Sequence, residues 1–586
     1  GRGIDSHAAV TRFLGVPSTG GTLENTGYAQ AGISAGARVR VASSRSLSIS
    51  YRHSEQGDSH RYDQEMGGNG RYRSVFGPQR LDFGFLRYES ARQSWFDEVS
   101  ATVSVNRQAD GRAEQRRPTE RLDEQVNTTT AIGYSVQATR TLAPRFKALF
   151  GADVYDEFIG GARVLTAPDG STSRARPDIP DGTRYTSVGV FWQQNAEVIP
   201  GRLHLRGGVR YGDFTFCSVR DDSLGVPEDS IRTRDTTFQA SGVLTLTPSL
   251  SLTTSVNRGF RAANAFDFGG IGLSGGAGYE ISPGRAVDLG GLRGSTDGAT
   301  AISTGQAVGD LRPERLMAYE AGVRWHSRRA SGSLTVFDLE FHDAIERRTL
   351  VFPTNVVNQD LAGYPVVRQD EVGRAYVAGE PRPIVTRVNV SRARIRGFEA
   401  DARFRVTASV RARAWGSAAN GSELDASRTP RRRMPPVMGG ASVTWQPVTA
   451  RWWIEGTMLA ASAQRRLSDG DLGDARIGAR RSLSSIAAFF SGTAVDRGLV
   501  ADGRLVSTGE TLAEVQARLL GAAPSQTLFT STPGFVVLGA RAGIALGSFL
   551  ELTVIGENVV DRNYRLHGSG VDEPGFNIQA RIRAMF

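Results

Sequence analysis

Two short patterns in the sequence contain residue types that could catalyse a reaction or bind a cofactor. Residues 32–36 (GISAG) fit G-x-S-x-G, which in hydrolases places a nucleophilic serine, here Ser34, at a strand-to-helix elbow. Residues 270–275 (GIGLSG) fit G-x-G-x-x-G, which cradles a phosphate when a helix follows it. No helical pattern follows either segment, so we interpret the first as a strand and the second as a loop. The sequence therefore predicts no enzyme activity and no cofactor.

A cluster of aspartates in the last quarter of the chain could hold a cation. Asp469, Asp471 and Asp474 offer carboxylate oxygens, which are the ligands that calcium prefers. Their spacing is not that of an EF-hand, and the glutamate that ends such a loop is absent. We therefore expect a solvated acidic turn and no metal site.

Two histidines and a run of arginines are the candidates for ligand binding. His53 and His60 fall in one predicted external loop, where imidazoles could contact a metal or haem. Arg431, Arg432 and Arg433 would suit an anionic ligand such as a ferric chelate, because guanidinium groups bind anionic oxygens strongly. The alternative for the arginines is contact with lipopolysaccharide phosphates, or simple solvation.

The composition excludes several classes of protein. Of the 586 residues 39% are hydrophobic, and no apolar run approaches the roughly 18 residues of a transmembrane helix. The net charge is +10, but the 60 acidic residues are interspersed with the basic ones, which does not favour nucleic acid as a partner. The single cysteine, Cys217, cannot form an internal disulfide. These exclusions leave a protein built from strands in which apolar and polar residues alternate.

The last stretch of the chain, residues 576–586, shows this alternation most clearly. Asn577, Gln579, Arg581 and Arg583 separate the apolar residues, which are Phe576, Ile578, Ala580, Ile582, Ala584 and Phe586. A strand with one apolar and one polar face suits a sheet between lipid and water. Similar strands occur throughout the chain, and about nine tight turns between them predict about nineteen strands.

Short and long connections alternate along the chain. The long ones are expected at roughly 108–124, 156–183, 217–235, 262–315, 346–384, 418–436 and 463–533. Bacterial outer-membrane barrels have short periplasmic turns and long external loops. One short helix is predicted, from Thr511 to Leu520, because Thr511 and Glu514 form a capping box and Gly521 ends it. The sequence therefore predicts an all-β fold, a transmembrane antiparallel β-barrel in the cell outer membrane.

Four segments, in order along the chain, resemble the TonB-dependent outer-membrane receptors. Residues 259–263 (GFRAA) are similar to the G-F-R-A-P box of that family, with Ala263 in place of proline. Residues 310–323 resemble its L-x-P-E…Y-E-x-G passage, 395–399 its I-x-G-x-E strand, and 557–564 its E-N-L-x-D-x-x-Y segment. The residues that carry the resemblance are Gly259, Phe260, Arg261, Ala262, Leu311, Pro313, Glu314, Tyr319, Glu320, Gly397, Glu399, Asn558, Asp561, Tyr564 and Phe586.

The resemblance implies a 22-stranded barrel around an N-terminal plug, importing a scarce nutrient such as a ferric siderophore or another metal chelate. Neither a plug nor a TonB box is visible here, so residues 1–26 are expected to be an external loop or incomplete N-terminal part, and 27–586 the barrel. The chain is then either the C-terminal piece of a longer receptor or one partner of a chain that completes the barrel. A structural scaffold in a larger outer-membrane complex is the alternative function.

The expected partners follow from the same resemblance. They are the TonB–ExbB–ExbD system acting through a plug, outer-membrane lipid and lipopolysaccharide, the barrel-assembly machinery through Phe586, and other outer-membrane proteins.

The alternation of apolar and polar residues also predicts which face of a strand contacts lipid and which faces the lumen. The predicted lipid face before the last turn comprises Val536, Leu538, Ala540, Ala542 and Ile544, and the predicted lumen face of the 397–405 strand comprises Glu399, Asp401, Arg403 and Arg405.

Overall fold

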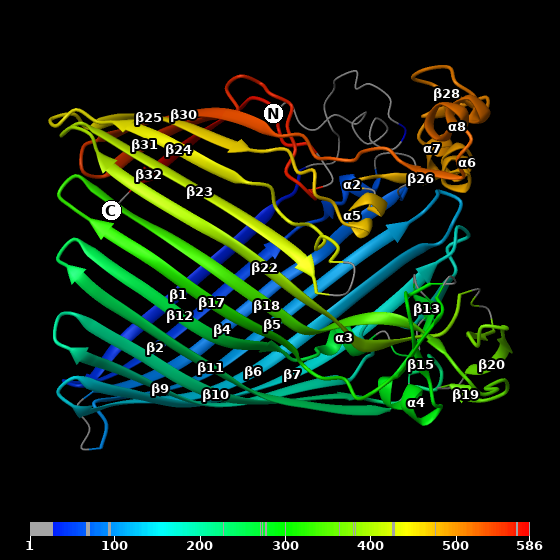
Figure 1. Ribbon diagram of the computed structural model, residues 1–586, viewed down its shortest axis with the longest axis horizontal. Helices are drawn as coiled ribbons and strands as arrows, with labels where there is room; N and C mark the ends of the chain where they lie inside the picture. The colour runs from blue at the N-terminus through cyan, green and yellow to red at the C-terminus, as the bar shows by residue number, and fades with distance from the viewer. Residues whose placement is uncertain are drawn as a thin grey trace.

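The structure is a computed structural model with a single large antiparallel sheet curved round on itself (Figure 1). It describes residues 14, 27–65, 71–91, 95–226, 228–269, 271, 274–275, 278–298, 301–361, 364–378, 380, 382–424, 428–474, 476–569 and 572–584. Among these residues, no helix is long and apolar enough to cross a lipid bilayer.

Long strands, each hydrogen bonded to the next in chain order, form the wall of the molecule. Within the described ranges they are β1 (Gln30–Ala42), β2 (Arg45–Gln56), β4 (Arg73–Ala91), β5 (Glu98–Gln115), β6 (Leu122–Ala143), β7 (Phe146–Thr166), β9 (Thr183–Ile199), β10 (Leu203–Ser218), β11 (Asp229–Thr247), β12 (Leu250–Arg261), β17 (Glu314–His326), β18 (Ala330–Val351), β22 (Val385–Arg405), β23 (Val410–Glu423), β24 (Met438–Trp445), β25 (Trp452–Ala461), β30 (Phe535–Leu546), β31 (Leu550–Glu557) and β32 (Asn577–Ala584). The predicted all-β barrel class and its number of long strands are confirmed.

Short turns join the strands at one end, but two of the expected long loops are largely strand. β5 continues to Gln115 and β6 begins at Leu122, so most of 108–124 is paired. β7 likewise extends to Thr166. Beyond the apolar band both faces of a hairpin contact water, so a strand there needs no apolar face. The part of β5 that contains Asp110 and Arg112 is an example. Main-chain hydrogen bonds still hold these strands together, which is why the alternation did not reveal them.

The register of the strands separates an apolar face from a polar one. Directly paired residues point to the same face of a sheet, and Leu538 lies opposite Met458 while Ile544 lies opposite Trp452. The predicted apolar face of β30 is therefore continuous with that of β25. On the other face Arg541 Nη1 lies 3.6 Å from Glu455 Oε1. Charged pairs of this kind identify the polar face as the lumen side of a barrel.

The long connections carry short elements that gather at one end of the wall (Figure 1). Before β9 these are β3 (Ser59–His60), α2 (Tyr62–Glu65) and β8 (Thr172–Ala175). Between β12 and β17 lie α3 (Ala265–Gly269), β13 (Ser274–Gly275), β14 (Gly278–Ile281), α4 (Pro283–Asp288), β15 (Leu292–Gly294) and β16 (Ser303–Ala307). Between β18 and β22 lie β19 (Asp360–Leu361), β20 (Tyr364–Gln369) and β21 (Ala375–Val377). Between β25 and β30 lie α5 (Asp469–Gly473), β26 (Arg480–Ser482), α6 (Leu483–Ser491), α7 (Thr493–Asp496), β27 (Val500–Ala501), β28 (Arg504–Leu505), α8 (Leu512–Leu520) and β29 (Ser525–Thr527).

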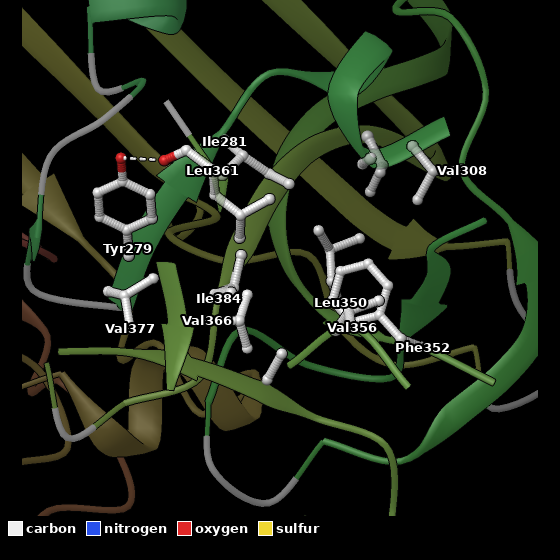
Figure 2. Close-up of a cluster of buried hydrophobic side chains, with 13 residues drawn as sticks. Tyr279, Ile281, Val308, Leu350, Phe352, Val356, Leu361, Val366, Val377 and Ile384 are labelled. Carbon is white, nitrogen blue, oxygen red and sulfur yellow. Dashed lines mark hydrogen bonds between the residues drawn. The ribbon is translucent and has the colours of Figure 1, made fainter. Parts of the chain in front are cut away.

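Two of these connections fold together into a compact unit, which we call the sheet module (β14–β16, α4 and β19–β21). Its apolar core is shown in Figure 2 and comprises Tyr279, Ile281, Ala286, Val308, Leu350, Phe352, Val356, Leu361, Val366, Ala375, Val377, Ile384 and Val388. The Tyr279 hydroxyl donates a hydrogen bond to the carbonyl oxygen of Leu361 at 2.9 Å. The core joins the connection before β17 to the one after β18, so two external loops form one folded body.

A second compact unit, the helical module (α6–α8 with β26–β29), lies between β25 and β30. Its core comprises Leu14, Ile486, Phe489, Ala494, Val500, Leu505, Val515, Leu519 and Leu520. The predicted helix is confirmed as α8: Thr511 Oγ1 accepts from the Glu514 backbone N–H, and the Glu514 carboxylate accepts from the Thr511 backbone N–H. Helices α6 and α7 were not predicted from the sequence.

Candidate functional site

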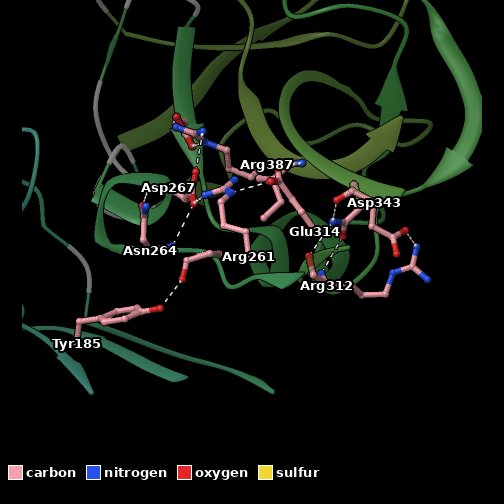
Figure 3. Close-up of polar contacts among 12 residues, drawn as sticks. Tyr185, Arg261, Asn264, Asp267, Arg312, Glu314, Asp343 and Arg387 are labelled. Atoms are coloured by element: carbon pink, nitrogen blue, oxygen red, sulfur yellow. Dashed lines mark hydrogen bonds and ion pairs between the residues drawn. The ribbon is translucent and has the colours of Figure 1, made fainter. Parts of the chain in front are cut away.

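Arg261 joins two of the sequence motifs at the loop end of the wall (Figure 3). Its Nε donates to Glu314 Oε2 and its Nη1 to Asp267 Oδ2, each at 2.6 Å. The second oxygen of Glu314 accepts from the backbone N–H of Ile345 at 2.8 Å. The GFRAA and LRPE segments therefore form one polar site that holds together the ends of β12, β17 and β18.

Arg387 of β22 extends this network to the sheet module, and Arg312 forms a separate ion pair beside it (Figure 3). Arg387 Nε donates to Glu280 Oε1 at 2.7 Å, and Arg387 Nη1 lies 3.7 Å from Asp267 Oδ1. Arg312 Nη2 donates to Asp343 Oδ1 at 2.6 Å. The sequence motifs included Arg261 and Glu314, but Asp267 lies six residues beyond Arg261 and outside the GFRAA motif. Arg387 was missed because it lies more than a hundred residues from its partners Glu280 and Asp267.

The other motif residues of the middle strands have separate roles. Ser255 Oγ donates to Glu320 Oε2 at 3.1 Å on the polar face of β17, while Tyr319 lies on the apolar face. A Cβ at Gly397 would lie 2.2 Å from the carbonyl oxygen of Ala418 and 2.5 Å from the ring of Phe337, so only glycine fits there. The residues that carry the sequence resemblance therefore include packing residues as well as charged ones.

These residues fall into groups by location. Gly259, Phe260 and Ala262 lie at the end of β12 or just beyond it, Leu311 and Pro313 lie just before β17, and Glu399 lies on the polar face of β22 opposite Ser417.

The motif near the chain end folds the connection between β31 and β32. Asn558 is buried, and its side-chain amide donates to the carbonyl oxygens of Arg562 at 2.8 Å and Pro574 at 3.1 Å. Asp561 Oδ1 accepts from the backbone N–H of Phe576 at 2.8 Å. These bonds fix the loop beside the polar face. Phe586 lies outside the described residues.

A cavity of about 660 Å³ lies between this loop and the polar face of β23–β25 and β30. Its polar and aromatic lining includes Trp415, Glu455, Arg541, Glu557, Tyr564 and Glu573. The ring of Tyr564 packs on Phe535 with the centroids 4.6 Å apart. A cavity with aromatic surfaces and charges of both signs can bind a polar organic molecule. Sequence reasoning identified Tyr564 as a motif residue but did not identify the cavity.

The three arginines predicted to bind an anion each have a carboxylate partner. Arg432 Nη2 and Arg433 Nη2 donate to Asp474 Oδ2 at 2.7 and 2.8 Å. Arg431 Nη1 donates to Glu423 Oε1 at 2.9 Å. An anionic ligand would therefore compete with existing ion pairs, and the ligand-binding role of these arginines stays a prediction.

Two of the three aspartates around α5, Asp471 and Asp474, have structural roles. Burial alone would raise the pKa of Asp474, but hydrogen bonds from Arg433, the Arg476 backbone and Arg432 lower this pKa to about 2. Asp471 is buried and accepts from Ser468 in a capping box and from the backbone N–H of Arg433 at 3.0 Å. The expected solvated turn is therefore wrong for Asp471 and Asp474, because a helix N-terminus and distant arginines engage their carboxylates, whereas Asp469 is exposed as expected.

The two candidate histidines lie on strands and not in one loop. His53 belongs to β2, where its Nδ1 is 2.8 Å from Asp82 Oδ1, and His60 belongs to β3, where its Nδ1 is 2.9 Å from Glu65 Oε1. Among the described residues, no group of three or more His, Cys, Asp or Glu side chains is placed to hold a metal ion. Contact of these histidines with a metal or haem stays a prediction.

The sequence matches a known family over nearly its full length. Residues 2–559 match the family described as TonB dependent receptor-like, beta-barrel. The chain belongs to this family. It is therefore an outer-membrane transport barrel and not an enzyme, and its family links it to the TonB system.

Solved structures share the fold of this TonB-dependent receptor-like barrel at low sequence identity. The copper transporter OprC is 12% identical with a TM-score of 0.64, and the match covers 97% of this chain and 73% of that one. The ferric citrate transporter FecA is 13% identical with a TM-score of 0.62, covering 96% and 71%. The ferric yersiniabactin uptake receptor FyuA from Yersinia pestis is 12% identical with a TM-score of 0.58, covering 97% and 72%. No curated protein sequence matches the chain.

Proposed function

We propose that this barrel takes up a scarce nutrient as a metal chelate, such as a ferric siderophore. The cavity beside the β31–β32 connection carries the proposal, because Trp415 and Tyr564 offer aromatic surfaces next to charged groups on the lumen side. Proteins of the same fold are named as a copper transporter, a ferric citrate transporter and a ferric yersiniabactin receptor. A chelate carries both organic surface and charge, which suits such a lining.

The transport cycle that we propose draws its energy from TonB with ExbB and ExbD, acting through a plug domain. The division of the chain into residues 1–26 and a barrel from 27 to 586 belongs to this proposal. So do contact with lipopolysaccharide, insertion by the assembly machinery through Phe586, and association with other outer-membrane proteins.

Uptake of ⁵⁵Fe supplied with a panel of chelates tests the proposal in cells that carry or lack the gene. We expect at least one chelate whose uptake depends on the gene. For that chelate Trp415→Ala should reduce uptake about tenfold, because Trp415 lines the cavity. Trp445→Ala is the matched control, since Trp445 lies on the apolar face and packs edge-on against Trp452 with the centroids 5.2 Å apart. It should leave uptake within about twofold.

Unchanged uptake of every chelate in the deletion strain would refute transport of this class. The second candidate, a structural barrel in a larger complex, would then be tested by purification from native membranes. Stable co-purification of other outer-membrane proteins would support it.

A further inference from the structure

Two pairs of arginines lie directly opposite each other across β22 and β23. The register pairs Arg403 with Arg413 and Arg405 with Arg411, and all four side chains are on the polar face, since Phe404 between them lies on the apolar face. Directly paired residues have Cβ atoms about 4.5–5.5 Å apart, and like charges at this separation repel. We call Arg403, Arg405, Arg411 and Arg413 the arginine square.

Only half of the square has a carboxylate partner. Asp401 Oδ2 accepts from Arg413 Nε at 2.8 Å, and Asp401 Oδ1 lies 3.4 Å from Arg403 Nε. Arg411 donates instead to the neutral side chain of Gln446, at 2.9 Å. In the part of the chain that the structure describes, no carboxylate lies within ion-pair distance of Arg405 or Arg411.

The square opens into a recess at the short-turn end of the wall. A cavity of about 640 Å³ is lined by Arg405 and Arg411 together with Arg328 and Arg329 of the β17–β18 turn. An adjoining cavity of about 560 Å³ shares these four arginines and adds Arg403 and Arg413. Glu455 also lines the second cavity, but Arg541 lies beside it at 3.6 Å. The recess therefore holds a large excess of positive charge.

We propose that the arginine square binds a phosphate-bearing anion at the periplasmic end of the lumen. Guanidinium groups bind phosphate oxygens in pairs of hydrogen bonds, and a multiply charged anion between them would remove the repulsion across the two strands. The tetrahedral oxygens of phosphate can engage forks from several directions, whereas a planar carboxylate suits one fork. Arginines that lie directly opposite each other repel and lower the stability of the fold locally. Such locally unfavourable arrangements are typical of functional sites.

Calorimetric titration of the full chain in detergent with inorganic pyrophosphate, at low salt, tests the proposal. Arg405→Ala combined with Arg411→Ala should weaken binding at least tenfold. The matched control is Arg581→Ala with Arg583→Ala, which removes two arginines from the polar face of β32, where Arg583 lies opposite Glu551. The control should bind within about twofold of the wild type. Equal losses in both variants would overturn the site in favour of a general charge effect.

Unfolding in urea gives an independent readout. Because the variant at 405 and 411 removes a repulsion, it should be at least as stable as the wild type without anion. Pyrophosphate should raise the unfolding midpoint of the wild type and of the control, but not that of the variant. A variant that is less stable and shows the same pyrophosphate-dependent shift would overturn the proposal.

A parallel titration with a short-chain phosphatidic acid distinguishes a lipid headgroup from a soluble phosphate. Saturable binding of either probe that depends on Arg405 and Arg411 supports the site and identifies the source of its phosphate. Absence of such binding for both probes would overturn it.

Discussion

The two external modules are attached to the same wall in different ways. The sheet module continues the wall: β14 pairs in parallel with β22, β15 pairs with β18, and Thr386 Oγ1 donates to the Ile281 carbonyl oxygen at 2.9 Å. The helical module instead reaches the β5–β6 turn through side chains. Arg117 Nε and Nη2 donate to the two carboxylate oxygens of Asp496 at 2.8 and 2.9 Å.

This difference predicts different dynamics for the two modules. Main-chain ladders and buried ion pairs hold the sheet module, so it should move only when the wall itself opens. The described contacts of the helical module with the wall are made by side chains. At the β5–β6 turn Arg117 Nη1 also donates to the Ser491 carbonyl oxygen at 3.1 Å, and Thr493 Oγ1 donates to the Arg116 carbonyl oxygen at 3.1 Å. Just before β4, Arg497 Nη2 donates to the carbonyl oxygens of Tyr72 at 2.6 Å and Arg71 at 3.3 Å. Because its core is its own, this module can leave the turn while staying folded.

The largest effect is expected from Arg387→Met in the polar network of the sheet module. Glu280 is buried and would lose its cationic partner, which should cost about 3–5 kcal/mol of unfolding free energy, whereas Asp267 keeps its hydrogen bond from Arg261. Urea unfolding and hydrogen exchange across β14 and β22 would measure it. Arg285→Met is the control in the same module. The Arg285 side chain donates to a neutral acceptor, the Asp360 carbonyl oxygen, at 2.9 Å, so its loss should change stability by less than about 1 kcal/mol.

A smaller effect on stability is expected from Arg117→Ala at the helical module. Ion pairs at a protein surface add little to stability, so the free energy of global unfolding should hardly change. Hydrogen exchange in α7 and at the β5–β6 turn should nevertheless rise severalfold. Arg220→Ala, which removes an exposed pair with Asp222 elsewhere, should leave exchange in α7 unchanged. An unaltered exchange rate in the first variant would show that the module is held by something other than this pair.

The smallest effect is a dependence on pH at α5, which lies before the helical module. The pKa of Asp474, about 2, is below the ordinary value of about 3.9 in an unfolded chain. Its stabilising contribution is therefore fully present above about pH 4 and is lost as the pH falls towards 2. Hydrogen exchange around residues 432–433 and 471–474 at pH 2 and pH 5 would measure this loss. In Asp474→Asn the loss of protection from hydrogen exchange between pH 5 and pH 2 should be smaller than in the wild type.

The sequence predicted those parts of the fold that depend on neighbours in the chain. Period-two alternation located the wall strands, and the Thr511–Glu514 capping box located α8. Helix α6 was not predicted because its capping residues are Ser482 and Ser485. A serine at the third helical position is not the usual partner in a capping box, which is Glu or Gln.

The candidate site was less predictable, because its partners are distant in the sequence. The sequence alone suggests that Arg432 and Arg433 bind an anion. In the structure both guanidinium groups donate to Asp474, which lies about forty residues later in the chain. Arg387 was likewise not predicted to join the Arg261 network, because it lies more than a hundred residues from its partners in the sequence. Charged residues acquire their function from partners that only the folded wall brings together.

The position of Leu14 has a practical consequence for anyone who shortens this protein. Leu14 is fully buried in the core of the helical module, and Arg518 Nη1 donates to its carbonyl oxygen at 3.0 Å. A truncated version that starts at β1 would leave a cavity in this core. Proteases would then cut α6 and α8 more readily, so removing residues before β1 would destabilise an external loop about five hundred residues away.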